Sequence, residues 1–236
     1  MKERDRRIAI FGSFGIVDRA TIEEVKKINN KQEFLLSEYT TGITINTTFN
    51  GNHPTQQQSN IVVPMLKTED DNMEVIFNEN LIFVRENIAR IEDYDSFRDI
   101  AINILVSIID ITKIKPTRLA CSGAFTDMIE ARADEIFGKI FANGTLAAIP
   151  SNEWELSIND KKRNNELNCD INGVLNIVRG REVIGTEKNI PAGPIVVVYD
   201  YNTAPETMSS ELDFSAEDIR SFVSAASEFR KKILEL

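Results

Sequence analysis

The sequence predicts an α+β fold built from two similar halves. Residues 7–14 align without a gap with residues 118–125, and the same offset pairs residues 20–25 with 131–136. Strand-like and helix-like segments also follow the same order in both halves. A shared strand followed in register by a shared helix, starting again halfway along the chain, is typical of a duplication. We therefore expect two tandem repeats, residues 1–117 and 118–236.

The first half predicts a strand, a helix, several further strands and a long helix. Residues 7–14 form a mostly apolar strand, and Thr21 and Glu24 make a capping box at the start of a helix. Alternation over residues 33–48 indicates a long strand, or a hairpin bent near Gly42. The remaining elements are a loop over 50–60, strands over 61–67 and 74–85 with a turn at 78–80, and a helix capped by Asp93 or Asp95 whose apolar stripe begins at Phe97.

The second half repeats this order. Asn172-Gly173 is a strong hairpin signal because both residues tolerate left-handed backbone, and Ser215 can cap the last helix. The predicted elements are a strand over 118–125, a helix over 126–141 ended by Asn143-Gly144, strands near 154–159, 167–171, 174–179 and 195–201, and a helix from Ser215.

The expected unit is a strand, a helix, three or four strands and a long helix, written twice with antiparallel sheets and a pseudo-twofold axis. By this element order, nearly the whole chain resembles the TATA-binding-protein-like fold. The resemblance implies that the two repeats join into one curved, saddle-like sheet with the long helices on its convex side. That family bends DNA with basic residues and paired Phe wedges. Nothing in this sequence matches those positions, so DNA bending is not expected.

Composition indicates a soluble globular protein. A chain of 236 residues with 42% hydrophobic residues can bury a sizeable core as one large domain or two small ones. Cys121 and Cys169 have no metal-like or redox-like spacing, the N-terminus has no apolar run of the signal-sequence type, and no segment is apolar enough to span a membrane. We expect a cytoplasmic location, and the abundance of Ile, Asn and Lys suggests an AT-rich microbial genome.

The charge argues against a nucleic-acid partner. The chain holds 27 Lys and Arg against 37 Asp and Glu, a net charge of -10, and acidic residues exceed basic ones in both halves. Such a surface repels phosphate backbones on average. Short basic clusters at residues 4–7 and 161–163 are expected to be a solvated tail and a solvated turn.

No catalytic residue, metal site or cofactor is predicted. The single histidine, His53, lies in a predicted loop without a recognisable partner, and neither a serine nucleophile elbow nor a phosphate-binding loop is present. Residues 168–173 resemble the start of a calcium loop. The twelfth position is Arg179 instead of the Glu that would bind calcium with both oxygens, which favours a hairpin turn.

The candidate ligand-binding residues are at the end of a late strand. Tyr199, Asp200, Tyr201 and Asn202 follow a loop stiffened by two prolines, and would place phenols, a carboxylate and an amide at one rim. The alternative is a turn in which Asp200 and Asn202 bond their own backbone.

Three hypotheses for function remain. The first is a non-enzymatic binding or assembly module that presents a sheet face or a strand edge to a protein partner or to a second copy, since the apolar helix after Phe97 needs extensive cover. The second is nucleic-acid recognition by a saddle-like concave surface, which requires the few basic residues to converge. The third is a metal-dependent enzyme that uses only carboxylates, such as Glu38, Asp170 and Asp200.

Overall fold

The computed structural model describes residues 1–50, 53–86, 94–127, 135–139, 154–179, 195–204 and 212–235. Side chains are described for all of these except residues 43–50 and 53–60. The elements of the first half are β1 (Lys2–Phe11), α1 (Arg19–Ile28), a 3-10 turn (Asn30–Gln32), β2 (Leu35–Asn50), β3 (His53–Lys67), β4 (Met73–Asn78), β5 (Leu81–Glu86) and α2 (Tyr94–Thr112). Those of the second half are β6 (Arg118–Asp127), a helical segment at 135–139, β7 (Trp154–Asn164), β8 (Cys169–Arg179), β9 (Ile195–Thr203) and α4 (Ala216–Leu234).

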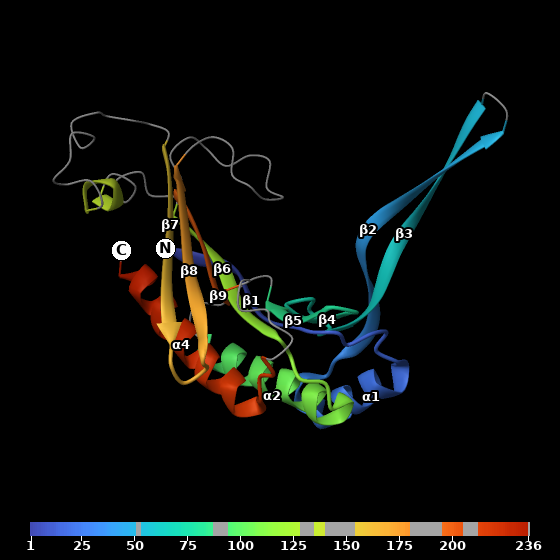
Figure 1. Cartoon of the computed structure of the whole chain (residues 1–236), viewed down its shortest axis with the longest axis horizontal. Helices are drawn as coiled ribbons and strands as arrows, with labels where there is room; N and C mark the ends of the chain where they lie inside the picture. Colours follow the sequence, from blue (N-terminus) through green and yellow to red (C-terminus); the bar gives the residue numbers. More distant parts are fainter. Residues whose placement is uncertain are drawn as a thin grey trace.

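The strands form one antiparallel sheet of nine, in the order β2-β3-β4-β5-β1-β6-β9-β8-β7. The two central strands, β1 and β6, pair with each other from Lys2 opposite Thr126 to Phe11 opposite Arg118. The fold is therefore α+β with a large antiparallel sheet, as predicted. Figure 1 shows the sheet as a curved layer, with the β2-β3 ribbon extending away from one end.

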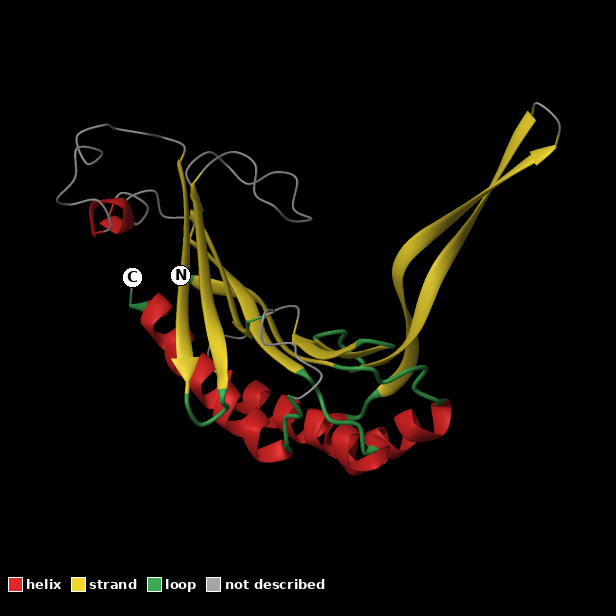
Figure 2. Cartoon of the chain, in the orientation of Figure 1, coloured by secondary structure: helices red, strands yellow, loops and turns green. Residues whose placement is uncertain are grey.

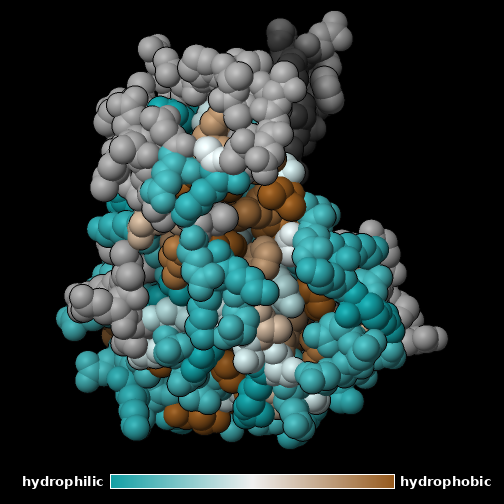
Figure 3. Space-filling model, turned by 90° about the vertical axis from the view of Figure 1, so that its left-hand side faces the viewer, coloured by the Kyte–Doolittle hydropathy of each residue, from teal (hydrophilic) through white to brown (hydrophobic). Residues whose placement is uncertain are grey.

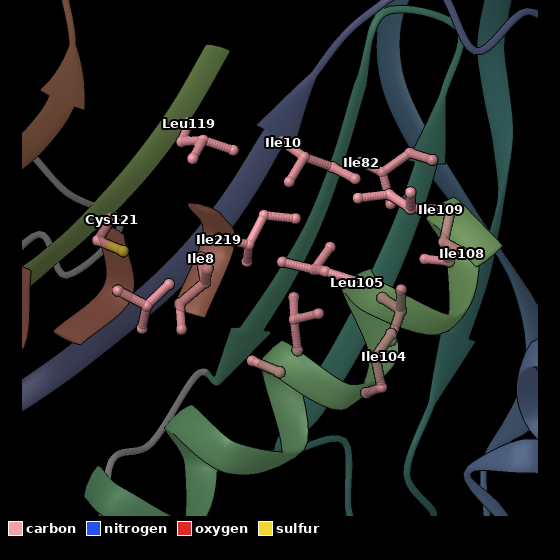
Figure 4. Packing of buried hydrophobic residues seen from close by; sticks show 14 of the residues in the cluster. Ile8, Ile10, Ile82, Ile104, Leu105, Ile108, Ile109, Leu119, Cys121 and Ile219 are labelled. Carbon is pink, nitrogen blue, oxygen red and sulfur yellow. The ribbon is translucent and has the colours of Figure 1, made fainter. Parts of the chain in front are cut away.

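Helices α1, α2 and α4 all lie against the same face of the sheet (Figure 2). The apolar helix α2 contacts α1 on one side and α4 on the other, and it also packs on β1 and β5. Its expected need for cover is therefore met within the chain. In Figure 4, Ile104, Leu105 and Ile108 of α2 meet Ile8 and Ile82 of the sheet. A continuous core between sheet and helices stabilises the fold.

The ends of several elements differ from the sequence predictions. The cap of α1 is Asp18, whose Oδ1 accepts a hydrogen bond from the Thr21 amide at 2.7 Å, so Thr21 lies inside the helix. Asp95 likewise lies inside α2, and Asp93 is outside the described residues. The Ser215 cap is confirmed, with a reciprocal capping box to Asp218. The turn between β4 and β5 at Glu79-Asn80 is also confirmed.

A predicted loop and a predicted turn are strands. Residues 53–60, including His53, continue β3, because the whole segment pairs with β2 up to the register Asn50 opposite His53. Asn172-Gly173 lies within β8, opposite Asn202 and Tyr201 of β9, and the chain turns earlier, at residues 165–168. Gly173 is needed for packing, since a Cβ there would lie 2.9 Å from the Phe229 ring. The calcium-loop interpretation is excluded because five of its first six residues, 169–173, lie in strand β8.

Three further expectations are corrected or lie outside the described residues. Thr126 and Asp127 end strand β6 instead of starting a helix, and the predicted end of that helix at Asn143-Gly144 is outside the described residues. The basic cluster at 161–163 lies in β7, so it is no turn. The sequence alignment also equated Phe14 with Phe125, but Phe14 lies in the loop after β1 while Phe125 lies within β6.

Candidate functional site

Strand alternation gives the central strands two chemically different faces. In β6, Leu119, Cys121 and Phe125 are buried among the core residues on the helix side. The intervening residues Ala120, Ser122, Ala124 and Thr126 therefore lie on the opposite face. None of the described helices covers that face (Figure 2). We call it the open face, and it is concave in Figure 1.

The open face carries a hollow, here called the central hollow, that extends from the central strands to the β7 edge. The hollow has a volume of about 380 Å³ and crosses five strands from β1 to β7. Its floor consists of the small residues Ser122, Gly123 and Ala124 of β6, which leave space that larger side chains would fill. The other lining residues are Asp5, Arg7, Glu155, Asn176, Val178, Val196 and Val198. Polar and aliphatic groups thus alternate around a shallow depression.

An ion pair borders this central hollow. Arg7 Nη2 lies 2.9 Å from Asp5 Oδ2, and both side chains are partly exposed. Asp5 Oδ1 and Arg7 Nε, in contrast, are buried and have no hydrogen-bond partner among the described residues. Buried polar atoms without partners cost the fold free energy, so the exposed parts of this ion pair, not these two atoms, face the hollow.

The four predicted site residues separate onto the two faces. Tyr199 is 1% exposed and stacks on Phe125, with ring centroids 5.6 Å apart, and Tyr201 packs on Phe222 and Phe229 of α4. Both phenols therefore lie on the helix side. Asp200 and Asn202 lie on the open face, opposite Ser122 and Ala120 of β6. The four side chains do not share one rim as expected, because successive residues of a strand point to opposite faces.

Asp200 and Asn202 form a polar pair beside the hollow. Asn202 Nδ2 donates a hydrogen bond to Asp200 Oδ2 at 2.7 Å. Burial raises the pKa of Asp200 above its usual value, although the bond from Asn202 and the charge of Arg118 partly oppose this rise. Asn202 Oδ1 and Arg118 Nε are buried without hydrogen-bond partners in the described part of the chain. The pair and Arg118 extend the row of polar side chains along the face.

Arginines stack on aromatic rings along the open face. The Arg118 guanidinium carbon lies 4.7 Å from the centre of the Phe11 ring, and that of Arg7 lies 5.7 Å from the Phe83 ring. Further along the sheet, Arg85 lies 5.6 Å from Tyr39. Sequence analysis missed these stacks because each joins residues of different strands that are distant along the chain.

A second ionic cluster lies beneath the sheet and is buried. Arg230 of α4 donates to both carboxylate oxygens of Glu3, at 3.0 Å and 2.5 Å, and Arg6 bonds Glu3 and Glu86. Glu3 and Arg6 are each 1% exposed. The expectation of a solvated tail at residues 4–7 is therefore wrong for Arg6. The cluster joins the first strand to the last helix and has a structural role.

Another hollow lies between α4 and the β7-β8 hairpin. Its floor is formed by Leu175, Ile171 and Phe229, and charged residues such as Lys162 and Glu228 border it. Figure 3 views this end of the molecule and shows hydrophobic residues between hydrophilic ones. No buried polar atom without a partner is found among its lining residues within the described structure, unlike the central hollow.

The described residues contain no group of three or more His, Cys, Asp and Glu that could hold a metal ion. Glu38 lies on the edge strand β2, far across the sheet order from Asp170 on β8 and Asp200 on β9, so these three carboxylates do not converge. None of the described helices is long and apolar enough to cross a membrane. A scan against models of protein families found no match, and a search of curated proteins found no similar sequence.

Proposed function

We propose that the chain is a duplicated, saddle-like binding module, with repeats at residues 1–117 and 118–236. The strand order supports this proposal. Outward from the central pair, β1 is followed by β5, the last strand of the first half, and β6 by β9, the last strand of the second. Each half then ends in a long helix on the same face. A pseudo-twofold axis between β1 and β6 would produce this arrangement.

The function that best fits this geometry is non-enzymatic binding of a protein partner on the open face. The single observation that carries the proposal is the central hollow, where the exposed Val198 lies beside the partly exposed ion pair of Asp5 and Arg7. Val198 is 36% exposed there, between Asp5 and Arg7 of β1 and Asn176 of β8. A surface that mixes apolar contact area with polar and charged side chains has the composition of protein interfaces.

A matched pair of variants tests the proposal. Val198→Glu adds a carboxylate to the open face, and Ser224→Glu adds one to an exposed position of α4. We expect the wild-type protein and the Ser224→Glu variant to retain the same protein from extracts of the source cells, and Val198→Glu to lose it. Equal retention by all three, with unchanged circular dichroism spectra, would refute the open face as the binding surface.

A second candidate function is nucleic-acid recognition on the same face. The specific observation in its favour is the series of arginines stacked on aromatic rings, because guanidinium and aromatic planes also stack on unpaired bases. The net charge of -10 opposes this candidate. We expect no mobility shift of single-stranded or duplex nucleic acid at physiological salt, and a salt-sensitive shift lost in Arg7→Glu would favour it over protein binding.

A further inference from the structure

The sheet has strand edges that differ in their protection. A free strand edge exposes unpaired N–H and C=O groups and recruits other strands unless charges, prolines or bulges prevent it. Strand β7 forms one outer edge, and it carries the charged run Asp160-Lys161-Lys162-Arg163. Beyond its short pairing with β4, β3 also has a free edge, but Pro54 and Pro64 there lack an N–H group.

Strand β2 forms the other outer edge, and its residues 42–50 carry neither a charge nor a proline. No Asp, Glu, Lys or Arg occurs between Glu38 and Lys67, and β2 contains no proline. A bulge between Thr40 and Gly42 interrupts its register with β3, but pairing is continuous from Gly42 to Asn50. The uninterrupted part of β2, residues 42–50, is therefore a strand edge that no other described strand covers, and it spans roughly 30 Å at the usual rise of a strand.

We propose that residues 42–50 of β2 pair with the same residues of a second copy, antiparallel and about a twofold axis, to give a weak dimer. Each copy carries a net charge of -10, so contact between two copies is opposed over most of the surface. A charge-free strand avoids this repulsion where the copies meet. Figure 1 shows that the β2-β3 ribbon extends away from the helices, so two copies joined at its outer part keep their bodies apart.

The size of the contact sets its strength. A strip about 30 Å long and about 10 Å thick buries roughly 300 Å² on each copy, below the area of stable interfaces. Self-association should therefore depend on concentration. It should also stop at two copies, because the pairing uses each β2 edge once and charges protect the β7 edge.

Sedimentation equilibrium over roughly 1 µM to 1 mM tests this proposal. The test variant is Thr44→Lys with Asn46→Lys, which places like charges in the pairing strands. The control is Ser157→Lys with Asn159→Lys, which makes the same charge change on β7, where both residues are exposed. We expect the wild type and the control to dimerise alike, and the test variant to dimerise at least tenfold more weakly.

Hydrogen exchange gives a second measurement that does not depend on the variants. Amides of residues 42–50 should exchange more slowly at high protein concentration than at low concentration, while those of β7 should not change. A wild-type protein that stays monomeric over the whole range overturns the proposal, as does equal weakening in both double-lysine variants. Protection of β2 only by a different protein would also overturn it. Val198→Glu should still dimerise, so failure of the open-face proposal would be distinguishable from failure of this one.

Discussion

Replacing Glu3 with Gln should strongly destabilise the protein, because it removes the anion from a buried cluster. The Glu3 side chain is fully buried and accepts hydrogen bonds from Arg230 at 3.0 Å and 2.5 Å and from Arg6 at 3.5 Å. Arg6 keeps Glu86 as a partner in the variant, whereas Arg230 loses its carboxylate. Breaking a buried ion pair by removing one partner costs about 3–5 kcal/mol, and we expect a loss in the free energy of unfolding of that size.

Urea denaturation followed by circular dichroism measures this loss. At a typical slope of about 1–3 kcal/mol per molar urea, the midpoint should fall by more than about 1 M. The control is Asp95→Asn, which breaks an ion pair to Arg98 whose carboxylate is 75% exposed, and should change stability by less than about 1 kcal/mol. The double variant Glu3→Met with Arg230→Met should be less destabilised than Glu3→Gln, because it leaves no unpaired charge at position 230. Equal midpoints for Glu3→Gln and Asp95→Asn would refute the reasoning.

Four other variants test the packing and the site. Burial raises the pKa of Tyr94 from 10.0 to about 12, so the folded state holds this proton more tightly than the unfolded state does; the stability that Tyr94 contributes should be fully present below pH 10 and lost between pH 10 and about 12, so urea midpoints across that range should fall less steeply in Tyr94→Phe than in the wild type. Truncation of Phe14 or Phe125, which are 6% and 0% exposed, to Ala should each cost about 3–5 kcal/mol, and unchanged thermal unfolding would contradict their burial. Asp200→Asn should raise the melting temperature, since burial raises the pKa of Asp200 and the charged form is unfavourable at neutral pH, yet it should weaken partner binding; a lower melting temperature would show that the carboxylate stabilises the fold.

Periodicity predicted the elements that are amphipathic or bounded by local signals. The apolar stripe that begins at Phe97 predicted helix α2, and the capping residue Ser215 predicted the start of α4. Both signals depend on residues that are close together in the chain. The α+β class followed from the order of these elements. Residues 53–60 were predicted as a loop because proline, glutamine and asparagine dominate them, yet pairing with β2 makes them a strand. Pairing with another strand cannot be predicted from the composition of the segment itself.

The candidate site was predicted less completely for a related reason. Asp200 and Asn202 were identified, but their open-face neighbours come from β1 and β6, which are distant in the sequence. The Asn172-Gly173 turn signal was overridden by tertiary packing, in which Gly173 leaves space for Phe229. Burial of Glu3 depends on Arg230, 227 residues away, and no local pattern in a charged N-terminus reveals it.

The most direct test of the binding role is a photo-crosslinking amino acid placed at position 198 of the open face and, as a control, at the exposed position 228 of α4. Crosslinking in the source cells should give one discrete adduct from position 198 that survives treatment with nuclease. Position 228 should give no such adduct. An adduct removed by nuclease, or identical adducts from both positions, would contradict the proposal that the open face binds a protein.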